Sequence, residues 1–107
     1  MKPLNVMKYI TNATKDVVSY TTRIKEAATF EAAKDIANQM YGYINCMNTF
    51  FNTMICMENN GFTADSDEVI ESWLYDMYQA LADKATETKQ DETVIMQCLR
   101  KRNEHHA

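Results

Sequence analysis

Apolar residues recur at helical spacing through the second half of the chain. Between residues 66 and 86 they return every three or four positions, which places them on one face of an α-helix: Val69, Ile70, Trp73, Leu74, Met77, Leu81 and Ala85. A longer helix is predicted from Phe30 to about Glu58, and Gly61 favours the left-handed conformation that ends helices. The pattern therefore predicts an all-α, bundle-like protein built on a helical hairpin of residues 30–58 and 66–86.

Polar residues mark the expected starts of these two helices. Thr29 suits an N-cap position, and Glu31 follows in the first turn, where the helix dipole favours an acid. Asp65 suits the second N-cap, and Glu68 three residues later completes a capping box. We therefore expect both helices to begin next to these residues.

The N-terminal region is predicted to form short helices. Residues 3–11 form the first, and residues 12–15 form a break. Residues 15–26 contain a β-branched run that suits a strand, yet Val17 and Ile24 fall at helical spacing and no second strand is predicted. We therefore expect a second short helix there.

The C-terminal region leaves one question open. Asp91 suits the N-cap of a last helix, but no Gly or Pro separates it from the preceding helix, so residues 66–103 form either one helix or two. Residues 103–107 are polar and predicted to fray. The whole chain, 1–107, is predicted to be a single domain with a basic helical segment at 1–28.

A segment from Ile36 to Met57 contains no Asp, Glu, Lys or Arg. A run of this length suggests a membrane span, but amide side chains are costly in hydrocarbon, and five occur within it: Asn38, Gln39, Asn45, Asn48 and Asn52. We therefore expect no membrane association and a helix that is covered by protein.

The uncharged segment has two different sides. One is apolar and includes the methionines at 40, 47 and 54, which suit a core or an adaptable binding surface. The other carries small and amide residues: Asn38, Gly42, Asn45, Thr49, Asn52 and Cys56. Small residues allow close helix approach, and buried Asn residues fix register. These six residues are the predicted interface of a homo-oligomer; the alternative is a polar outer face that contacts water.

The chain contains three cysteines and no CxxC motif. Cys46 and Cys56 lie in the apolar run and are predicted to be buried, reduced thiols. Residues 1–15 show no continuous apolar segment typical of a signal peptide. We therefore expect a cytoplasmic protein.

Charge is unevenly distributed although the net value is only −4. Residues 1–25 are basic, whereas residues 61–92 hold nine acidic residues against Lys84 and Lys89. The two regions either attract each other or form separate solvated faces. The acidic stretch is much less densely charged than a duplex, so nucleic-acid mimicry is a weaker interpretation.

Cations and phenol rings occur together near the N-terminus. Cations hold phosphates and aromatic rings stack on bases, so these residues form an alternative site for a nucleotide-like small ligand between protomers: Lys8, Tyr9, Lys15, Tyr20, Arg23 and Lys25. Basic residues are too few to favour a long nucleic acid.

Catalytic motifs are lacking in the sequence. The only histidines are His105 and His106, so no His is available elsewhere to activate a nucleophile, and no metal or cofactor motif is present. The sequence predicts a non-enzymatic helical binding protein without cofactor. We expect it to act as an adaptor, regulator or inhibitor of another protein through a homo-oligomeric scaffold.

Overall fold

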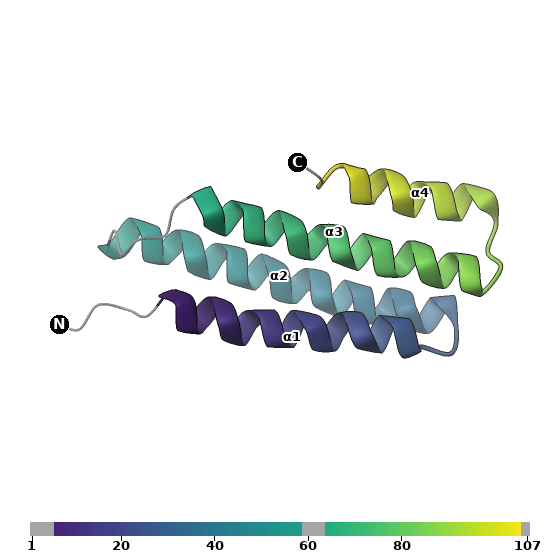
Figure 1. The fold of residues 1–107 in the computed structure, drawn as a ribbon, viewed down its shortest axis with the longest axis horizontal. Helices are drawn as coiled ribbons and strands as arrows, with labels where there is room; N and C mark the ends of the chain where they lie inside the picture. The colour runs from purple at the N-terminus through teal and green to yellow at the C-terminus, as the bar shows by residue number, and fades with distance from the viewer. Residues whose placement is uncertain (1–5, 59–63, 106–107) are drawn as a thin grey trace.

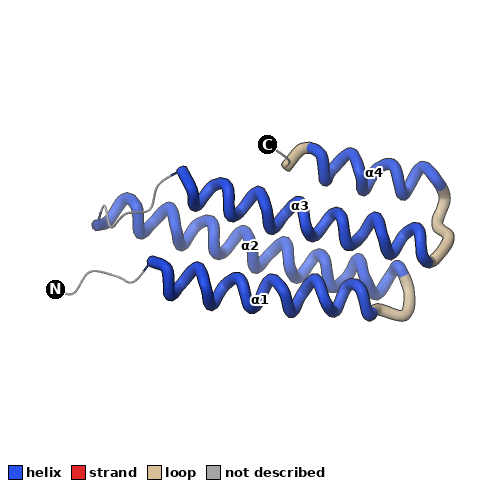
Figure 2. The backbone as a smooth tube through the Cα atoms, viewed as in Figure 1, coloured by secondary structure: helices blue, strands red, loops and turns tan. Residues whose placement is uncertain are grey.

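The computed structural model describes the backbone of residues 6–58 and 64–105, and the side chains of residues 8–53 and 67–105. This part of the chain forms four helices and no strand, which confirms the all-α prediction (Figures 1 and 2). The helices are α1 (Val6–Glu26), α2 (Phe30–Glu58), α3 (Ala64–Glu87) and α4 (Glu92–Asn103).

The helices form an elongated bundle of 54 × 24 × 15 Å. Each helix of α1, α2 and α3 packs against the other two, and successive helices run in opposite directions (Figure 1). In contrast, α4 packs on α3 alone, on the side of α3 away from α1. The molecule is therefore a three-helix bundle with a fourth, shorter helix added to one edge.

The core lies where α1, α2 and α3 meet. On α2 it consists of residues that the spacing places on one side: Ala33, Ala37, Met40, Ile44 and Phe51, all buried. The predicted face of α3 contributes Ile70, Trp73, Leu74, Met77, Leu81 and Ala85, while Ala13, Val17 and Ile24 come from α1. Burial of these apolar side chains is the main force that holds the three helices together.

The predicted break at residues 12–15 is wrong, because α1 continues through it. Ala13 is buried in the core, and the Thr14 hydroxyl donates a hydrogen bond to the Ile10 carbonyl at 2.8 Å. A threonine that bonds back to the preceding turn is compatible with a helix interior. One helix of 21 residues therefore replaces the expected short helices.

Two predicted helix starts are confirmed. The Thr29 hydroxyl accepts a hydrogen bond from the Ala32 N–H at 3.1 Å, and the Asp91 carboxylate accepts one from the Thr93 N–H at 2.9 Å. The predicted N-cap position of Asp65 is wrong: α3 begins at Ala64, so Asp65 lies within the first turn of the helix. The Asp65 side chain lies outside the described residues.

Residues 66–103 form two helices rather than one. Lys89 has a φ of 57°, in the left-handed region that is rare for residues with a side chain. The N–H of Lys89 bonds to the Thr86 carbonyl and that of Gln90 to the Ala85 carbonyl. This is the Schellman arrangement that ends helices, built here on lysine instead of glycine.

A buried lysine holds the end of α1. The Lys84 side chain is 3% exposed, and its ammonium donates to the carbonyls of Lys25 at 2.7 Å and Ala27 at 2.8 Å. It also pairs with the exposed Glu87 carboxylate at 3.2 Å. A cation at a helix C-terminus is favoured by the helix dipole and satisfies carbonyls that have no partner inside the helix. Lys84 thereby fixes the turn between α1 and α2 against α3.

Candidate functional site

The uncharged face of α2 is the surface that the sequence predicts as an interface: Asn38, Gly42, Asn45, Thr49, Asn52 and Cys56. The first five are exposed in the protomer, and the Cys56 side chain lies outside the described residues. The neighbouring exposed residues Gln39, Cys46 and Thr53 also carry no charge. Between Ile36 and Thr53, the described surface of α2 therefore presents no charged side chain to solvent.

Gly42 lies on this face between Asn38 and Asn45. A Cβ atom added there would meet nothing within 4 Å, so packing inside the protomer does not require glycine at this position. Glycine in a helix interior destabilises the helix by roughly 0.5–1 kcal/mol relative to alanine. The protomer alone therefore gives no reason for Gly42.

Cys46 also lies on this side of α2, and its predicted burial is wrong. It is a free, exposed thiol, because position 46 projects away from the core side that holds Met40 and Ile44. Its apolar sequence neighbours belong to other sides of the helix. The predicted burial of Cys56 falls outside the described side chains.

The six residues of the alternative ligand site are spread along α1. Lys8, Lys15, Arg23 and Lys25 are all exposed. The structure brings Arg23 and Tyr20 together, with the guanidinium carbon 5.6 Å from the ring centroid. This is a cation–π geometry, in which Arg23 covers a face of the Tyr20 ring within the protomer.

The other members of that set lie in different surroundings. Tyr9 packs edge-on against Phe50, with ring centroids 5.4 Å apart, and lines a hollow between α1 and α2. Lys25 lines a separate hollow between α1 and α3, beside Asp76. One protomer therefore does not gather the six residues around one cavity.

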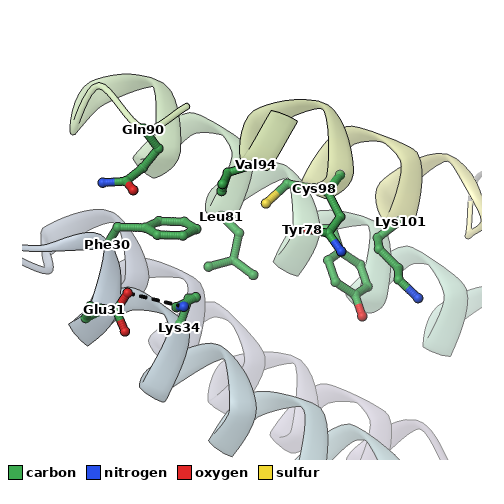
Figure 3. A pocket seen from close by; sticks show the side chains of 10 residues that line it. Phe30, Glu31, Lys34, Tyr78, Leu81, Gln90, Val94, Cys98 and Lys101 are labelled. Carbon is green, nitrogen blue, oxygen red and sulfur yellow. Dashed lines mark ion pairs between the residues drawn. The ribbon is translucent and has the colours of Figure 1, made fainter. Parts of the chain in front are cut away.

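A groove lies between α2 and α4 (Figure 3). It exists because α4 packs on α3 and not on α2, so that α3 forms the floor. The hollow beside α4 has a volume of about 390 Å³, and an adjoining hollow beside Asn38 and Tyr41 has about 470 Å³. Both hollows are lined by Lys34, Tyr78 and Leu81, so they lie next to each other.

Most side chains that line the hollow beside α4 are uncharged. Phe30 and Leu81 are buried beneath it, and Val94 and Cys98 enter from α4 (Figure 3). Burial raises the pKa of the Cys98 thiol, and the nearby Lys34 offsets this only in part. Burial also raises the pKa of Tyr78, so both groups are protonated at neutral pH.

Charge lies at the rim of the groove. The Lys34 ammonium pairs with the Glu31 carboxylate at 3.2 Å and lies 5.4 Å from the centroid of the Phe30 ring. Lys101 reaches the rim from α4 beside Tyr78 (Figure 3). The sequence does not predict this site, because its walls come from segments that are far apart along the chain, and only the packing of α4 on α3 brings them together.

Residues 104–105 follow α4, and His105 lies against α3; residues 106–107 of the segment predicted to fray lie outside the described residues. The His105 ring stacks on Tyr78, with centroids 5.7 Å apart and planes 2° from parallel, and a ring nitrogen lies 2.7 Å from the Glu71 carboxylate. Arg102 donates to the Gln79 side-chain oxygen at 2.6 Å. The end is therefore held by polar and stacking contacts through His105.

Within the described residues, no cluster of three or more His, Cys, Asp or Glu side chains is placed to hold a metal ion. In the same residues, no helix has both the length and the apolar character needed to cross a membrane. Comparison with protein-family models, with curated proteins and with solved structures finds no match of any kind. The surfaces described above are therefore the basis for a functional assignment.

Proposed function

We propose that this chain is a non-enzymatic helical binding protein that assembles as a homo-oligomer through the uncharged face of α2. In this proposal, the hairpin of α2 and α3 forms the scaffold of an adaptor, regulator or inhibitor of another protein. The observation that carries the proposal is the long exposed side of α2 without a charged side chain. Exposed sides of helices in soluble proteins ordinarily carry charged residues.

The chemistry of this face suits a second copy of the same chain. In a two-fold symmetric interface each surface meets itself, so it must be self-complementary. An amide group both donates and accepts hydrogen bonds, so Asn38, Asn45 and Asn52, spaced seven residues apart on one stripe, can pair with their own symmetry mates. A stripe of like charges would repel its copy.

The position of Gly42 supports the same partner. Because the space around its Cα is open in the protomer, a helix from a second copy can approach the α2 backbone closely there. Close approach allows more van der Waals contact between two helices, which offsets the cost of glycine in the helix interior. Gly42 lies between Asn38 and Asn45, so close approach there would bring both amides near the second copy.

Light scattering coupled to size-exclusion chromatography tests the proposal. We expect the protein to show a mass of at least twice 12.4 kDa at micromolar concentration. Asn45→Lys places like charges opposite each other and should weaken assembly by about ten-fold or more, equivalent to about 1.4 kcal/mol. Thr22→Lys adds the same charge on the exposed side of α1 and serves as the matched control.

A monomer of 12.4 kDa at several hundred micromolar would contradict the proposal, and so would equal assembly of both lysine variants. In either case the uncharged face contacts water, and its composition needs another explanation.

The alternative function, a nucleotide-like ligand bound between protomers at the basic N-terminal segment, has less support. Arg23 and Tyr20 are already in contact with each other, and Lys25 lies in a different hollow from Tyr9. This alternative requires a neighbouring protomer to complete the site. A thermal-shift screen with nucleotides tests it, because a ligand at 100 times its Kd raises the free energy of unfolding by about 2.7 kcal/mol.

A further inference from the structure

The groove between α2 and α4 has the size of a small-molecule site. The hollow beside α4, of about 390 Å³, falls in the range of roughly 300–1,000 Å³ that is typical of ligand pockets. Phe30, Leu81 and Val94 give it an apolar surface that is hollowed rather than filled by a side chain (Figure 3). An apolar molecule placed there would remove this surface from water.

The charges at the rim favour an anion. Among the described residues, Glu31 is the only carboxylate that lines the hollow beside α4, and Asp35 lines only the adjoining hollow. The Glu31 side chain is 81% exposed and already paired with Lys34. Lys101 contributes a second cation, and in the described part of the chain its ammonium makes no hydrogen bond or ion pair. A carboxylate beside Lys101 would therefore gain a partner without displacing one.

From this arrangement, we propose that the groove between α2 and α4 binds a small amphiphilic anion, an alkyl or aryl carboxylate. The apolar body lies on Phe30, Leu81 and Val94, and the carboxylate lies at the rim next to Lys101. The hollow beside α4 is lined by none of the six residues of the uncharged face of α2, and Asn38 lines only the adjoining hollow. The ligand is placed in the hollow beside α4, so each proposal can fail without the other.

Cys98 provides a direct reporter of occupancy. Its half-buried thiol lines the groove, whereas Cys46 lies outside it, on the uncharged side of α2 that we propose as the assembly face. The two rates are therefore compared with and without ligand at one protein concentration, so that the state of assembly is the same. A ligand in the groove should shield Cys98 from an alkylating reagent and leave Cys46 unaffected. Because burial raises the pKa of the Cys98 thiol, the reaction is best followed at mildly alkaline pH, where more thiolate is present.

The experiment uses the full chain, N-ethylmaleimide and decanoate, with alkylation at each cysteine followed by peptide mass spectrometry. We expect decanoate to slow alkylation of Cys98 in a saturable way and to leave the rate at Cys46 unchanged. Decanol, which has the same chain without the charge, should protect clearly less well. Lys101→Gln should weaken decanoate protection roughly two- to five-fold, as expected for one solvent-facing ion pair.

Lys15→Gln is the matched control, because Lys15 is exposed on α1 and does not line the groove. In this variant, decanoate should protect Cys98 as well as it does in the unmodified chain. Three results would overturn the proposal: no protection of Cys98 by decanoate, equal slowing at Cys46 and Cys98, or equal protection by decanol. If Lys101→Gln and Lys15→Gln change decanoate protection equally, Lys101 does not bind the carboxylate, which would also contradict the proposal.

Discussion

The two sides of α2 differ in burial and in composition. On the inner side, Ala37, Met40 and Ile44 are buried, and each contributes to the core between α1, α2 and α3. On the outer side, Asn38, Gly42 and Asn45 are exposed, although they carry no charge. Contacts within the protomer account for the inner side and leave the outer side without an explanation.

Lys84 gives the opposite case, a charge inside the molecule. It is buried near the turn between α1 and α2, where two carbonyls accept hydrogen bonds from its ammonium. Its location is explained by these partners, since a buried charge is tolerated when it is hydrogen-bonded. Contacts within the protomer therefore explain the buried charge of Lys84, whereas they do not explain the absence of charge on the exposed side of α2.

The largest expected effect distinguishes the two sides of α2 directly. Ile44→Ala removes a fully buried side chain and leaves a cavity, so it should lower the free energy of unfolding by about 2–5 kcal/mol. Thr49→Ala on the outer side should change it by no more than about 0.5 kcal/mol at concentrations where the chain is monomeric. Urea denaturation measures both. Comparable losses would show that the outer side is packed within the protomer.

A smaller effect is expected when the buried charge is removed. Lys84→Met keeps the apolar stem but deletes the donor to the Lys25 and Ala27 carbonyls. Loss of charge-assisted hydrogen bonds should lower the free energy of unfolding by about 1.5–3 kcal/mol. Lys15→Met, at an exposed site, is the control and should be nearly neutral. If both substitutions have the same small effect, the carbonyls at the end of α1 find other partners.

The sequence predicts the core faces of α2 and α3 because their apolar residues follow a single period. The N-caps at Thr29 and Asp91 were also predictable, since each uses a local side-chain bond. The break at residues 12–15 was wrongly predicted because Asn and Thr are typical of both turns and helix surfaces. Only the packing of Ala13 into the core decides between them.

The groove between α2 and α4 could not be predicted for a different reason. Phe30 and Cys98 line the same hollow but lie far apart along the chain. Their proximity depends on the left-handed conformation at Lys89, which turns α4 back onto α3. Glycine would have signalled such a turn, whereas lysine gives no signal.

Tyr43 lies at the boundary between the two sides of α2, and its substitution should have a moderate effect. Its hydroxyl donates to the Asp16 carboxylate at 2.6 Å, and burial, followed by this hydrogen bond, raises the Tyr43 pKa well above the usual 10.0. The folded state thus retains the Tyr43 proton that the unfolded state releases above pH 10.0, so stability is present below this pH and falls above it.

Tyr43→Phe should therefore lower the free energy of unfolding at neutral pH by about 0.5–1.5 kcal/mol, the usual contribution of one hydrogen bond. The difference from the unmodified chain should shrink as the pH rises above 10.0. Denaturation at a series of pH values measures this. A difference that stays constant up to strongly alkaline pH would show that the two states bind this proton equally.

The smallest expected effect concerns Gly42, and its sign is more informative than its size. Alanine in a helix interior is favoured over glycine, so Gly42→Ala should raise the stability of the dilute monomer by roughly 0.5–1 kcal/mol. If a second α2 approaches closely at this point, the added methyl group should at the same time weaken assembly. Thr22→Ala, which also raises helix propensity on an exposed side, should leave assembly unchanged. Thermal unfolding measures the stability of the monomer, and sedimentation measures the strength of assembly. A Gly42→Ala chain that is more stable and equally assembled would place this part of α2 in water.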